Sequence, residues 1–538
     1  MNTWRLIARG LAHHWRTHLG VLIGVACATA VLVGALVVGD SVRLSLREQA
    51  LQRVGRFESV LACGDRFVTA ELAERIGATL DARACAALQL PGVANRGEGP
   101  ARAGIVDVYG VGDGFFSMSS GGVGRPAPPP GHALLNRRIA DQLGVGVGDE
   151  LVLRVEKPSL MPQEATMATV DDVAHALRVA VDEVLEDHEF GRFGLRASQV
   201  PPFNVFVSRA WLAEELGLAG RANLVLADVE AARGDAAFAE RWRLEDAELE
   251  LIEHASGCEL RSDRVFLDDA VVEAAAGIAP DGLGLFTYFV NAVRVGDRAT
   301  PYSMICGVGP LRGGARVAEG LAGLAALAPN TDDGITANAW LAEDLRANAG
   351  AEAELRYYVM NEQLQLKEQT QQLRLTAVAP LAGAAADPSL MPEFPGLAEA
   401  RSCTDWEPGV PVELDQLDDR DQAYWDEHRG TPKGFVTLAR ARAMWANRFG
   451  TLTAVRAPTA AAPLLRDGLL RRVPPAELGL FFQDLRGPAL ASGAPATDFG
   501  ALYLGLSFFL IVAALLLTVL LFVFGVERRG GGWGADSG

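Results

Sequence analysis

Two long apolar runs near the ends of the chain constrain its fold more than any other feature. Residues 19–38 and 501–526 contain no charged side chain. About 20 apolar residues are enough for a helix to cross the hydrocarbon core of a bilayer. We therefore expect two transmembrane helices that flank a large polar region, residues 39–500.

The first apolar run permits two other interpretations. The segment Ala28–Ala30 (ATA) resembles the cleavage site of a secretory signal, and a lipoprotein signal would end at Cys27. The apolar run continues to Val38, beyond both positions, and the 18 residues before it form a longer lead than a signal usually has. We favour a transmembrane helix, with a cleaved signal as the alternative.

Basic residues beside the two runs predict the orientation of the chain. Arg5, Arg9 and Arg16 precede the first run, and Arg528 and Arg529 follow the second. Arginine and lysine close to a span favour the cytoplasmic side. Both termini are therefore expected in the cytoplasm, and the polar region is expected outside the bacterial cytoplasmic (inner) membrane.

The polar region is acidic, and this charge limits which partners it can bind. It holds 65 of the 67 acidic residues of the chain but only 44 of the 49 basic ones. Such a surface has no electrostatic attraction for nucleic acid. An anionic leaflet would also repel it. We expect no nucleic-acid partner and a soluble part that stands clear of the lipid.

Helical patterns surround the first run. Residues 2–17 place Trp4, Ile7, Leu11 and Trp15 at spacings of three and four, which predicts an interfacial helix on the inner leaflet. After the run, Asp40 or Ser41 is a candidate N-cap for a further helical pattern. The membrane helix is thus predicted to continue outward as a stalk; a separate surface helix after a short loop is the alternative.

An internal similarity indicates a duplicated lobe. Residues 135–155 resemble residues 337–357 at an offset of 202, and each copy reads as a short helix, a glycine turn and an alternating strand. Two modules of mixed helix and sheet are expected, with chance similarity as the alternative. The matches are Asn136 with Asn338, Leu143 with Leu345, Gly148 with Gly350, Arg154 with Arg356, residues 109–116 with 306–311, and the pentapeptide PSLMP at Pro158 and Pro388.

Three further segments carry local predictions. Residues 169–189 have apolar residues at helical spacing behind a capping-box pattern, which predicts a packed helix. Residues 190–207 read as strand and loop, because two prolines interrupt them. In residues 424–456, core packing explains Trp445 and Phe449 better than a ligand site does.

Motifs for chemistry are absent. The sequence contains no P-loop, GxSxG or HExxH motif. The acidic clusters at 186–189 and 418–428 include histidines, but charge runs of this kind are more typical of solvated faces than of metal sites. The scattered cysteines suggest no zinc site, and only Cys63 with Cys85 is a candidate disulfide. We expect no metal or cofactor, and a catalytic acid and base cannot be picked out among the 67 carboxylates.

The order of these segments resembles the permease subunit of the FtsX/MacB-like (type VII) ABC transporters, over nearly the whole chain. The stretches that carry the resemblance are GVLIGVACATAVLVGALVVGDSVR in the first run, NRRIADQLGVGVGDELVL in the polar region and LGLSFFLIVAALLL in the second run. DPSLMPEFPGL and RGTPKGFV resemble a branch with an enlarged periplasmic domain.

The resemblance implies a mechanical role for a permease subunit that is itself non-catalytic. In that family a separate cytoplasmic ATPase moves the membrane helices, and stalks pass the motion to a periplasmic domain that acts on lipoproteins, lipids, peptides or cell-wall enzymes. The implied partners are that ATPase, a second permease copy or homologue, and the bilayer. On this reading the first stalk starts at Asp40, Ser41, Val42 and Arg43. Neither apolar run carries a charge that would indicate an ion route.

We therefore expect an α+β fold in which two transmembrane helices flank a large mixed α/β extracytoplasmic domain. The predicted parts are an interfacial helix (1–18), a transmembrane helix (19–38), a stalk (39–60), lobe 1 (61–300), lobe 2 (301–500), a second transmembrane helix (501–526) and a cytoplasmic tail (527–538).

The final residues depart from the family pattern. Relatives continue after VERR with a coupling helix and two more spans, whereas GGGWGADSG stands here. A frameshift or premature stop after Arg529 is the expected cause. The alternatives to a permease are a two-span sensor or scaffold with a ligand- or partner-binding ectodomain, and a membrane-tethered hydrolase.

Overall fold

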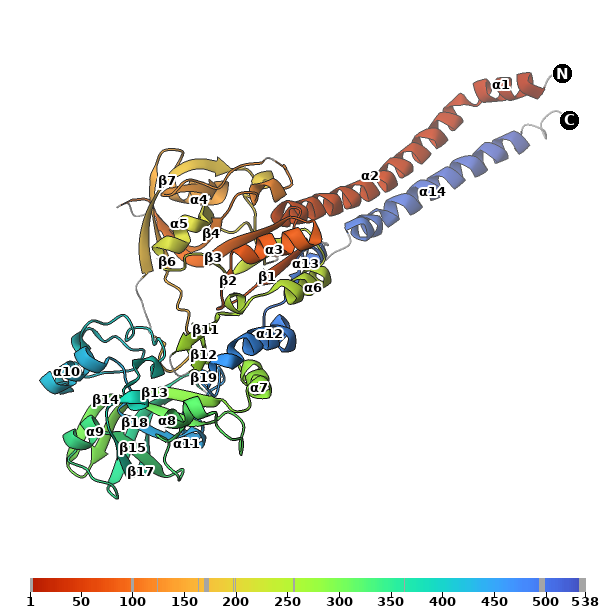
Figure 1. Ribbon diagram of the computed structural model, residues 1–538. Helices are drawn as coiled ribbons and strands as arrows, with labels where there is room; N and C mark the ends of the chain where they lie inside the picture. The colour runs from red at the N-terminus through yellow and green to blue at the C-terminus, as the bar shows by residue number, and fades with distance from the viewer. Residues whose placement is uncertain are drawn as a thin grey trace, which may run out of the picture.

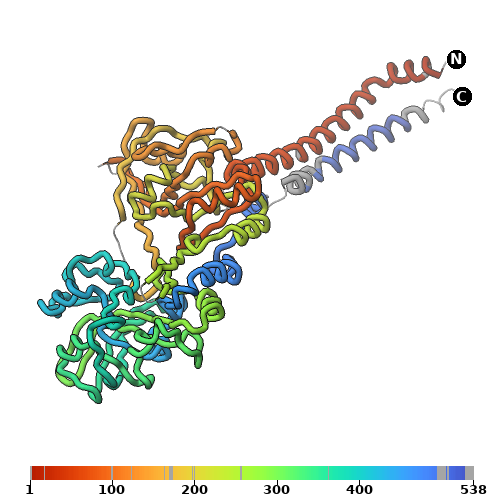
Figure 2. Tube along the Cα trace, viewed as in Figure 1, coloured from red at the N-terminus to blue at the C-terminus, as the bar shows by residue number. Residues whose placement is uncertain are grey.

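The computed structural model describes residues 3–531, apart from 98–100, 123, 163, 169–173, 197, 199, 255–256, 362 and 493–498. Figure 1 and Figure 2 show two long helices that leave one end of a two-lobed body and run side by side to the termini. They are α2 (Trp15–Val54) and α14 (Phe499–Gly531), and the short helix α1 (Thr3–His13) precedes α2.

Helix α2 joins the first apolar run to the polar residues beyond it. It is one uninterrupted helix of 40 residues, so the expected helical continuation is confirmed and a separate surface helix is wrong. Asp40 and Ser41 lie inside this helix, where backbone N–H groups already have acceptors four residues earlier. The N-cap predicted at these residues is therefore wrong.

The structure supports one apolar helix of full transmembrane length. Within the described residues, His18–Val54 is long and apolar enough to cross a membrane, whereas the apolar part of α14, Ile511–Glu527, is shorter. The second span expected at residues 501–526 remains a prediction.

Lobe 1 contains a nine-stranded sheet in which six strands close into a barrel. The ring runs β3-β4-β8-β5-β7-β6, and β6 also pairs with β3. Strands β10, β1 and β20 extend the sheet beyond β3. The strands are β1 (Ser59–Ala62), β3 (Ala84–Asn95), β4 (Arg102–Val111), β5 (His132–Asn136), β6 (Glu150–Glu156), β7 (Ala174–Leu185), β8 (Asn204–Ser208), β10 (Leu224–Ala227) and β20 (Phe482–Asp484), and the helices are α3 (Glu71–Leu80), α4 (Arg137–Leu143), α5 (Arg209–Glu215), α6 (Ala231–Arg241) and α13 (Arg486–Ser492).

Lobe 2 repeats this arrangement. Its ring runs β13-β14-β18-β15-β17-β16, β16 also pairs with β13, and β19, β12 and β11 extend the sheet. The strands are β11 (Leu249–His254), β12 (Gly257–Ser262), β13 (Leu283–Val295), β14 (Arg298–Pro310), β15 (Gly334–Asn338), β16 (Glu352–Met360), β17 (Leu366–Ala379), β18 (Gly434–Thr437) and β19 (Ala454–Ala457), and the helices are α7 (Asp269–Ile278), α8 (Ala322–Ala325), α9 (Ala339–Asp344), α10 (Asp419–His428), α11 (Leu438–Trp445) and α12 (Ala462–Arg472).

The predicted internal similarity is confirmed, because residues 135–155 and 337–357 form the equivalent units β5-α4-β6 and β15-α9-β16. The side chain of Asn136 accepts a hydrogen bond from the Ile139 N–H at 3.2 Å and so caps α4. Asn338 caps α9 in the same way through the Leu341 N–H at 2.8 Å. Equivalent residues thus start equivalent helices.

The two repeats exchange their last strands. In the first repeat α6 leads through a 3₁₀ turn to β11, and in the second α12 leads through a 3₁₀ turn to β20. Strand β11 pairs with β12 of lobe 2, whereas β20 pairs with β1 of lobe 1. The largest hydrophobic cluster accordingly includes Leu61 and Phe482 of lobe 1 and Leu260 of lobe 2. We call this arrangement the reciprocal strand exchange.

One predicted helix is a strand. Residues 174–185 form β7, while the proposed capping box at Thr169–Asp172 lies outside the described residues. Leu177, Val179 and Val181 are buried in alternation. Leu177 and Val181 are four residues apart, a spacing that fits one face of a helix as well as one face of a strand. The strand expected within residues 190–207 is confirmed as β8.

Two other expectations differ from the structure. The boundary expected between residues 300 and 301 falls inside β14, and sheet membership changes between β10 and β11 instead. The pentapeptide at Pro158 follows β6, whereas its second occurrence at Pro388 follows β17. These places are not equivalent, so the shared PSLMP is not part of the structural repeat.

Candidate functional site

The chain segments that lead to and from the long helices meet at one edge of lobe 1. Helix α2 leads into β1, and β20 leads into α13 and on toward α14. Because β1 and β20 are paired antiparallel at the edge of the sheet, both segments end on neighbouring strands. We call residues 54–62 together with residues 482–489 the stalk junction.

Gly55 makes the turn at the base of α2. Its φ is +61°, a conformation that glycine adopts more readily than other residues. A Cβ atom there would lie 2.3 Å from the Met118 carbonyl oxygen and 2.7 Å from the Phe190 ring. The next N–H, of Arg56, donates to the same Met118 oxygen at 2.8 Å. No side chain fits at this position.

Aromatic side chains hold the base of α2. Phe57 is fully buried and packs against Phe115 and Phe190, each at 5.8 Å between ring centroids. The same cluster contains Val54 from α2 and Leu485 from the β20–α13 connection. Aromatic pairs of this geometry add about 0.5–1.5 kcal/mol each beyond area burial. The stalk base is therefore packed into lobe 1.

Glu58 links the two segments directly. Its carbonyl oxygen accepts hydrogen bonds from the Leu485 N–H at 2.9 Å and the Arg486 N–H at 3.3 Å. Its carboxylate lies 3.8 Å from the Arg486 guanidinium. A displacement of either segment is therefore transmitted to the other through Glu58.

Small residues let the two long helices approach one another. A Cβ at Gly20 of α2 would lie 3.7 Å from a methyl carbon of Leu521, and one at Gly24 would lie 3.5 Å from the Thr518 hydroxyl oxygen. Glycines four residues apart on one face are a common basis for close packing of membrane helices. The Thr518 hydroxyl donates to the Ala514 carbonyl at 2.7 Å, so it stays satisfied within α14.

Ion pairs cross the joint between the lobes. Arg264 of lobe 2 is 3.0 Å from the carboxylate of Asp65 in lobe 1. Arg66, Arg75 and Arg221 of lobe 1 likewise pair with the carboxylates of Asp268, Asp246 and Asp263. Together with the reciprocal strand exchange, these contacts fasten one lobe to the other.

Glu248 is a deeply buried acid of this joint. It lies just before β11, its φ is +59°, and it accepts from the Phe67 N–H of lobe 1 at 3.1 Å. Burial raises the pKa of its carboxyl to about 7, although the guanidinium groups of Arg264 and Arg66 act in the opposite direction. The joint therefore contains a carboxyl that changes its charge near neutral pH.

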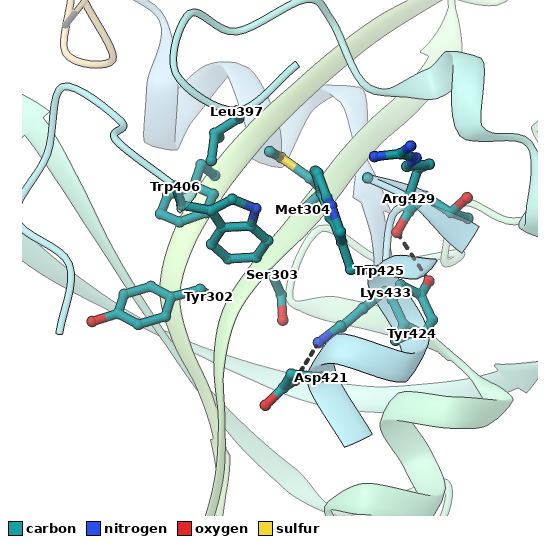
Figure 3. A pocket seen from close by; sticks show the side chains of 13 residues that line it. Tyr302, Ser303, Met304, Leu397, Trp406, Asp421, Tyr424, Trp425, Arg429 and Lys433 are labelled. Carbon is teal, nitrogen blue, oxygen red and sulfur yellow. Dashed lines mark hydrogen bonds and ion pairs between the residues drawn. The ribbon is translucent and has the colours of Figure 1, made fainter. Parts of the chain in front are cut away.

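A small cavity of about 20 Å³ lies in lobe 2, away from the long helices. Strands β13 and β14 supply one wall, and residues 380–433, between β17 and β18, supply the other. Figure 3 shows Lys433 directed at Asp421 and two indole rings, Trp406 and Trp425, beside Met304. Core packing of Trp445, expected from the sequence, is confirmed, because its ring stacks on Tyr288 at 5.2 Å.

The cavity contains a buried charge pair. The Lys433 ammonium lies 3.0 Å from the Asp421 carboxylate, and both side chains are 7 % exposed. The ammonium also lies 4.1 Å from the centroid of the Trp340 ring and 5.0 Å from that of Tyr424. Burial lowers the pKa of Lys433, and the Asp421 carboxylate acts against this effect.

The predicted site residues occupy two separate regions. Arg5, Arg9 and Arg16 lie on α1 and the start of α2, far from lobe 1, and Arg528 and Arg529 lie on the final turn of α14. The predicted stalk start is a mid-helix segment of α2. The structure does not test the roles assigned to these residues. Sequence reasoning missed the stalk junction, although Gly55 directly follows the stalk pattern.

The acidic clusters engage in ion pairs. Glu186 contacts Arg137, and Glu189 lies 3.0 Å from Arg125. No three His, Cys, Asp or Glu side chains come together as a metal site in the described part of the chain. All six cysteines are unbonded, and β10 separates Cys85 in β3 from Cys63, which follows β1.

Comparisons with known proteins found similarity in solved structures only. No family model and no curated protein sequence matches the chain. The periplasmic region of MacB from Actinobacillus actinomycetemcomitans is 10% identical over 35% of this chain and 84% of its own length, with a TM-score of 0.23. The extracellular domain of the noncanonic ABC-type transporter YknZ from Gram-positive bacteria is 10% identical over 32% of this chain and 84% of its own length, with a TM-score of 0.21.

Proposed function

We propose that the protein is the permease subunit of an FtsX/MacB-like ABC transporter. It performs no chemistry itself. A separate cytoplasmic ATPase moves the two long helices, and the stalk junction passes this motion to the extracytoplasmic lobes. The exported substrate belongs to the lipoprotein, lipid, peptide or cell-wall related classes that the sequence resemblance implies.

The observation that carries this proposal is the meeting of both stalk segments at Glu58. The segment that follows α2 and the segment that follows β20 are hydrogen-bonded to each other at Glu58, and the strands beside them, β1 and β20, are paired at the edge of one sheet. A relative movement of the two helices therefore acts on β1 and β20 together. Because β20 belongs to the second repeat, the movement also reaches the joint between the lobes.

The proposal includes a membrane arrangement. Helix α2 and α14 both span the bacterial inner membrane, α1 lies on the inner leaflet, and both termini are cytoplasmic. The close contacts of Gly20 and Gly24 with α14 support a helix pair inside the lipid. We propose that the assembly also contains a second permease copy or homologue and two ATPases.

The test is a distance measurement that depends on nucleotide. Spin labels are placed at Leu44 on α2 and at Leu364 on lobe 2, both exposed, after replacement of the exposed Cys27 by serine. The full chain is purified from its host with the ATPase that accompanies it. Vanadate-trapped ADP is expected to shift the distance distribution relative to the nucleotide-free complex. An unchanged distribution with an active ATPase would contradict the proposal.

A matched pair of glycine variants isolates the stalk junction. Gly55→Ala places a methyl group against the Met118 oxygen, whereas Gly64, with φ +67°, has no atom within 4 Å of the added Cβ. A positive φ alone strains an alanine at both positions, at a cost of about 1–3 kcal/mol. Gly55→Ala is expected to abolish the nucleotide-dependent shift while the ATPase stays bound, and Gly64→Ala is expected to retain it.

The alternative is a two-span sensor or scaffold whose ectodomain binds a ligand or partner. In that case ligand, and not nucleotide, changes the distance between Leu44 and Leu364. The same labelled chain distinguishes the two functions.

A further inference from the structure

The connection between β6 and β7 in lobe 1 is far longer than its equivalent in lobe 2. It covers residues 157–173, whereas residues 361–365 join β16 to β17. A short turn is thus enough to link two such strands. We call the described part of the longer connection, residues 157–162 and 164–168, the strap. Figure 1 shows the chain after β6 passing from lobe 1 to lobe 2.

The strap is buried, although it connects two strands. Met161 is fully buried, and Ala165–Ala168 are each at most 5 % exposed. Connections usually run over the surface, because a buried one needs partners for its backbone polar groups. The buried apolar side chains of the strap belong to the hydrophobic cluster that contains Trp406 of lobe 2, whereas Leu151 of the lobe 1 barrel belongs to another. The strap therefore packs outside the barrel from which it comes.

Polar side chains tie the strap to two elements of lobe 2. The Thr166 hydroxyl oxygen accepts a hydrogen bond at 3.2 Å from the N–H of Met360, the last residue of β16. Water has little access to this hydroxyl, so the bond contributes to stability. The Glu164 carboxylate contacts Arg448 between α11 and β19, and this exposed pair contributes little.

Gly409 seats the end of the strap. A Cβ atom there would lie 1.8 Å from the Ala168 carbonyl oxygen and 2.8 Å from the Met167 carbonyl carbon. Gly409 belongs to residues 380–433, so this segment of lobe 2 and the strap touch through their backbones. A side chain at this position would displace the strap.

The contacts of the strap lie on other elements than the joint. The joint is made by ion pairs and by the reciprocal strand exchange, whereas the strap contacts β16, residues 380–433 and the α11–β19 connection. Motion between two compact units is the default unless their interface is large. Two lobes held at one place can rotate about it, and a second fastening on different elements removes that freedom.

We propose that the strap locks lobe 2 to lobe 1, so that both lobes move as one rigid lever when the stalk junction moves. The stalk junction lies in lobe 1, and lobe 2 follows through its connections to lobe 1. The lock is independent of transport, whereas its use as a lever rests on the proposed function.

Hydrogen exchange of the full chain in nanodiscs tests the seat. The N–H groups of Ala165 and Ala168 donate to the carbonyls of Pro162 and Ala165, and their exchange reports local opening. Gly409→Ala is expected to speed this exchange at least about tenfold, which corresponds to about 1.4 kcal/mol of overpacking. Gly313→Ala, with no atom within 4 Å of the added Cβ, is expected to leave it unchanged. Equal exchange in the two variants overturns the seat.

A strapless variant tests the lock. Residues 157–173 are replaced by the sequence of residues 361–365. In both lobes the two strands stay in register up to the residues beside their connection, so the short turn meets equivalent strand ends. The barrel of lobe 1 is therefore expected to stay closed without the strap.

The distance between the lobes gives the result. Spin labels are placed at exposed Ile105 on β4 and exposed Val378 on β17, after replacement of Cys27 and Cys85 by serine. The wild type without nucleotide is expected to give one narrow distance distribution, and the strapless variant a broader one. An unchanged distribution in the strapless variant overturns the lock. Should that variant not fold, Gly409→Ala decides by the same measurement.

A second pair of distances tests the lever in the complex with the ATPase. Labels at Leu44 and Ile105 report on lobe 1, and labels at Leu44 and Val378 report on lobe 2. Vanadate-trapped ADP is expected to shift both distances in the wild type and only the first in the strapless variant. Two shifts in the strapless variant overturn the lever. No shift in the wild type with an active ATPase contradicts the proposed function and leaves the lock intact.

Discussion

Lobe 1 and lobe 2 share one strand order but place opposite chemical groups at the same point of the fold. In lobe 1 the Arg138 guanidinium, from α4, lies 4.4 Å from the centroid of Phe203, just before β8. In lobe 2 Trp340, from α9 at the offset of 202, lies 4.1 Å from the ammonium of Lys433, just before β18. Cation and ring have changed places, and the contact is kept.

The difference follows the division of tasks proposed above. Lobe 1 carries the stalk junction and uses a half-buried arginine at this point. Lobe 2 carries the longer segment 380–433, buries the lysine and therefore needs Asp421 as its counter-charge. The same backbone arrangement therefore has a different electrostatic environment in each lobe. The environment in lobe 1 suits anchoring of the stalk, and the one in lobe 2 lines a cavity.

The largest expected effect tests the buried pair of lobe 2. Lys433→Met keeps the length of the side chain and leaves the Asp421 carboxylate buried without its partner, which costs about 3–5 kcal/mol of unfolding free energy. Urea unfolding of the full chain in nanodiscs measures the loss. Lys367→Met, at an exposed position of β17, is the control and is expected to stay within about 0.5 kcal/mol of the wild type. Equal losses of unfolding free energy in Lys433→Met and Lys367→Met would contradict the cost assigned to the unpaired Asp421 carboxylate.

The next effect concerns the joint between the lobes and its pH dependence. The Glu248 carboxyl has a pKa of about 7 in the folded protein against 4.5 in an unperturbed chain. Between these pH values the folded state holds a proton that the unfolded state has released. Stability therefore falls as pH rises from 5 to 8, by up to about 3 kcal/mol from this group.

Glu248→Gln is expected to remove that pH-dependent contribution. Urea midpoints at pH 5, 6, 7 and 8 measure it as the difference between wild type and variant. Glu150→Gln, at an exposed position in β6, is expected to follow the wild type. A constant difference across this pH range would mean that the Glu248 carboxyl does not titrate there.

Equivalent glycines give the third comparison. A Cβ at Gly307 would lie 2.2 Å from the Cβ of Ala441, whereas a Cβ at Gly110 would lie 3.1 Å from Leu212 and from the Arg209 backbone. Overpacking costs about 1–3 kcal/mol. We expect Gly307→Ala near the upper end and Gly110→Ala near the lower end, measured as shifts in the urea midpoint. The reverse order would show that α11, which contains Ala441, moves away from its strand more easily than α5, which contains Arg209 and Leu212.

The smallest effect tests the equivalence of the repeats. Asn136→Ala and Asn338→Ala each remove a helix N-cap, at about 1–2 kcal/mol. We expect the two losses to agree within about 0.5 kcal/mol, because the two amides also donate to equivalent carbonyl groups, of Pro202 before β8 and of Pro432 before β18. Exposed Asn348→Ala is the control, and a clear inequality would indicate that one cap has lost its structural role.

The repeat and the long helix were predictable because their signals are local. Asn136 and Asn338 each cap a helix that lies within one short unit of the sequence. The helical pattern after Val38 likewise continues without interruption. The reciprocal strand exchange was not predictable. Strand β20 has three residues, and its partner β1 lies more than 400 positions earlier, so no local pattern records the pairing.

The prediction of a helix at residues 169–189 shows a different limit. Leu177 and Val181 satisfy two periodicities, and only the burial of Val179 between them decides for a strand. The cavity was missed for another reason. Its walls come from β13, β14 and residues 380–433, which are brought together by the closed barrel and not by their order in the chain.

The reciprocal strand exchange has a consequence for biosynthesis. A chain that emerges from its N-terminus presents β1 early, but the outer neighbour of β1 consists of residues 482–484. Domains usually fold as units in the order of their synthesis. Here the edge of the first lobe stays open until almost all of the second lobe has been synthesised. During this interval the unpaired N–H and C=O groups of β1 form an exposed strand edge, which is a template for pairing with other chains.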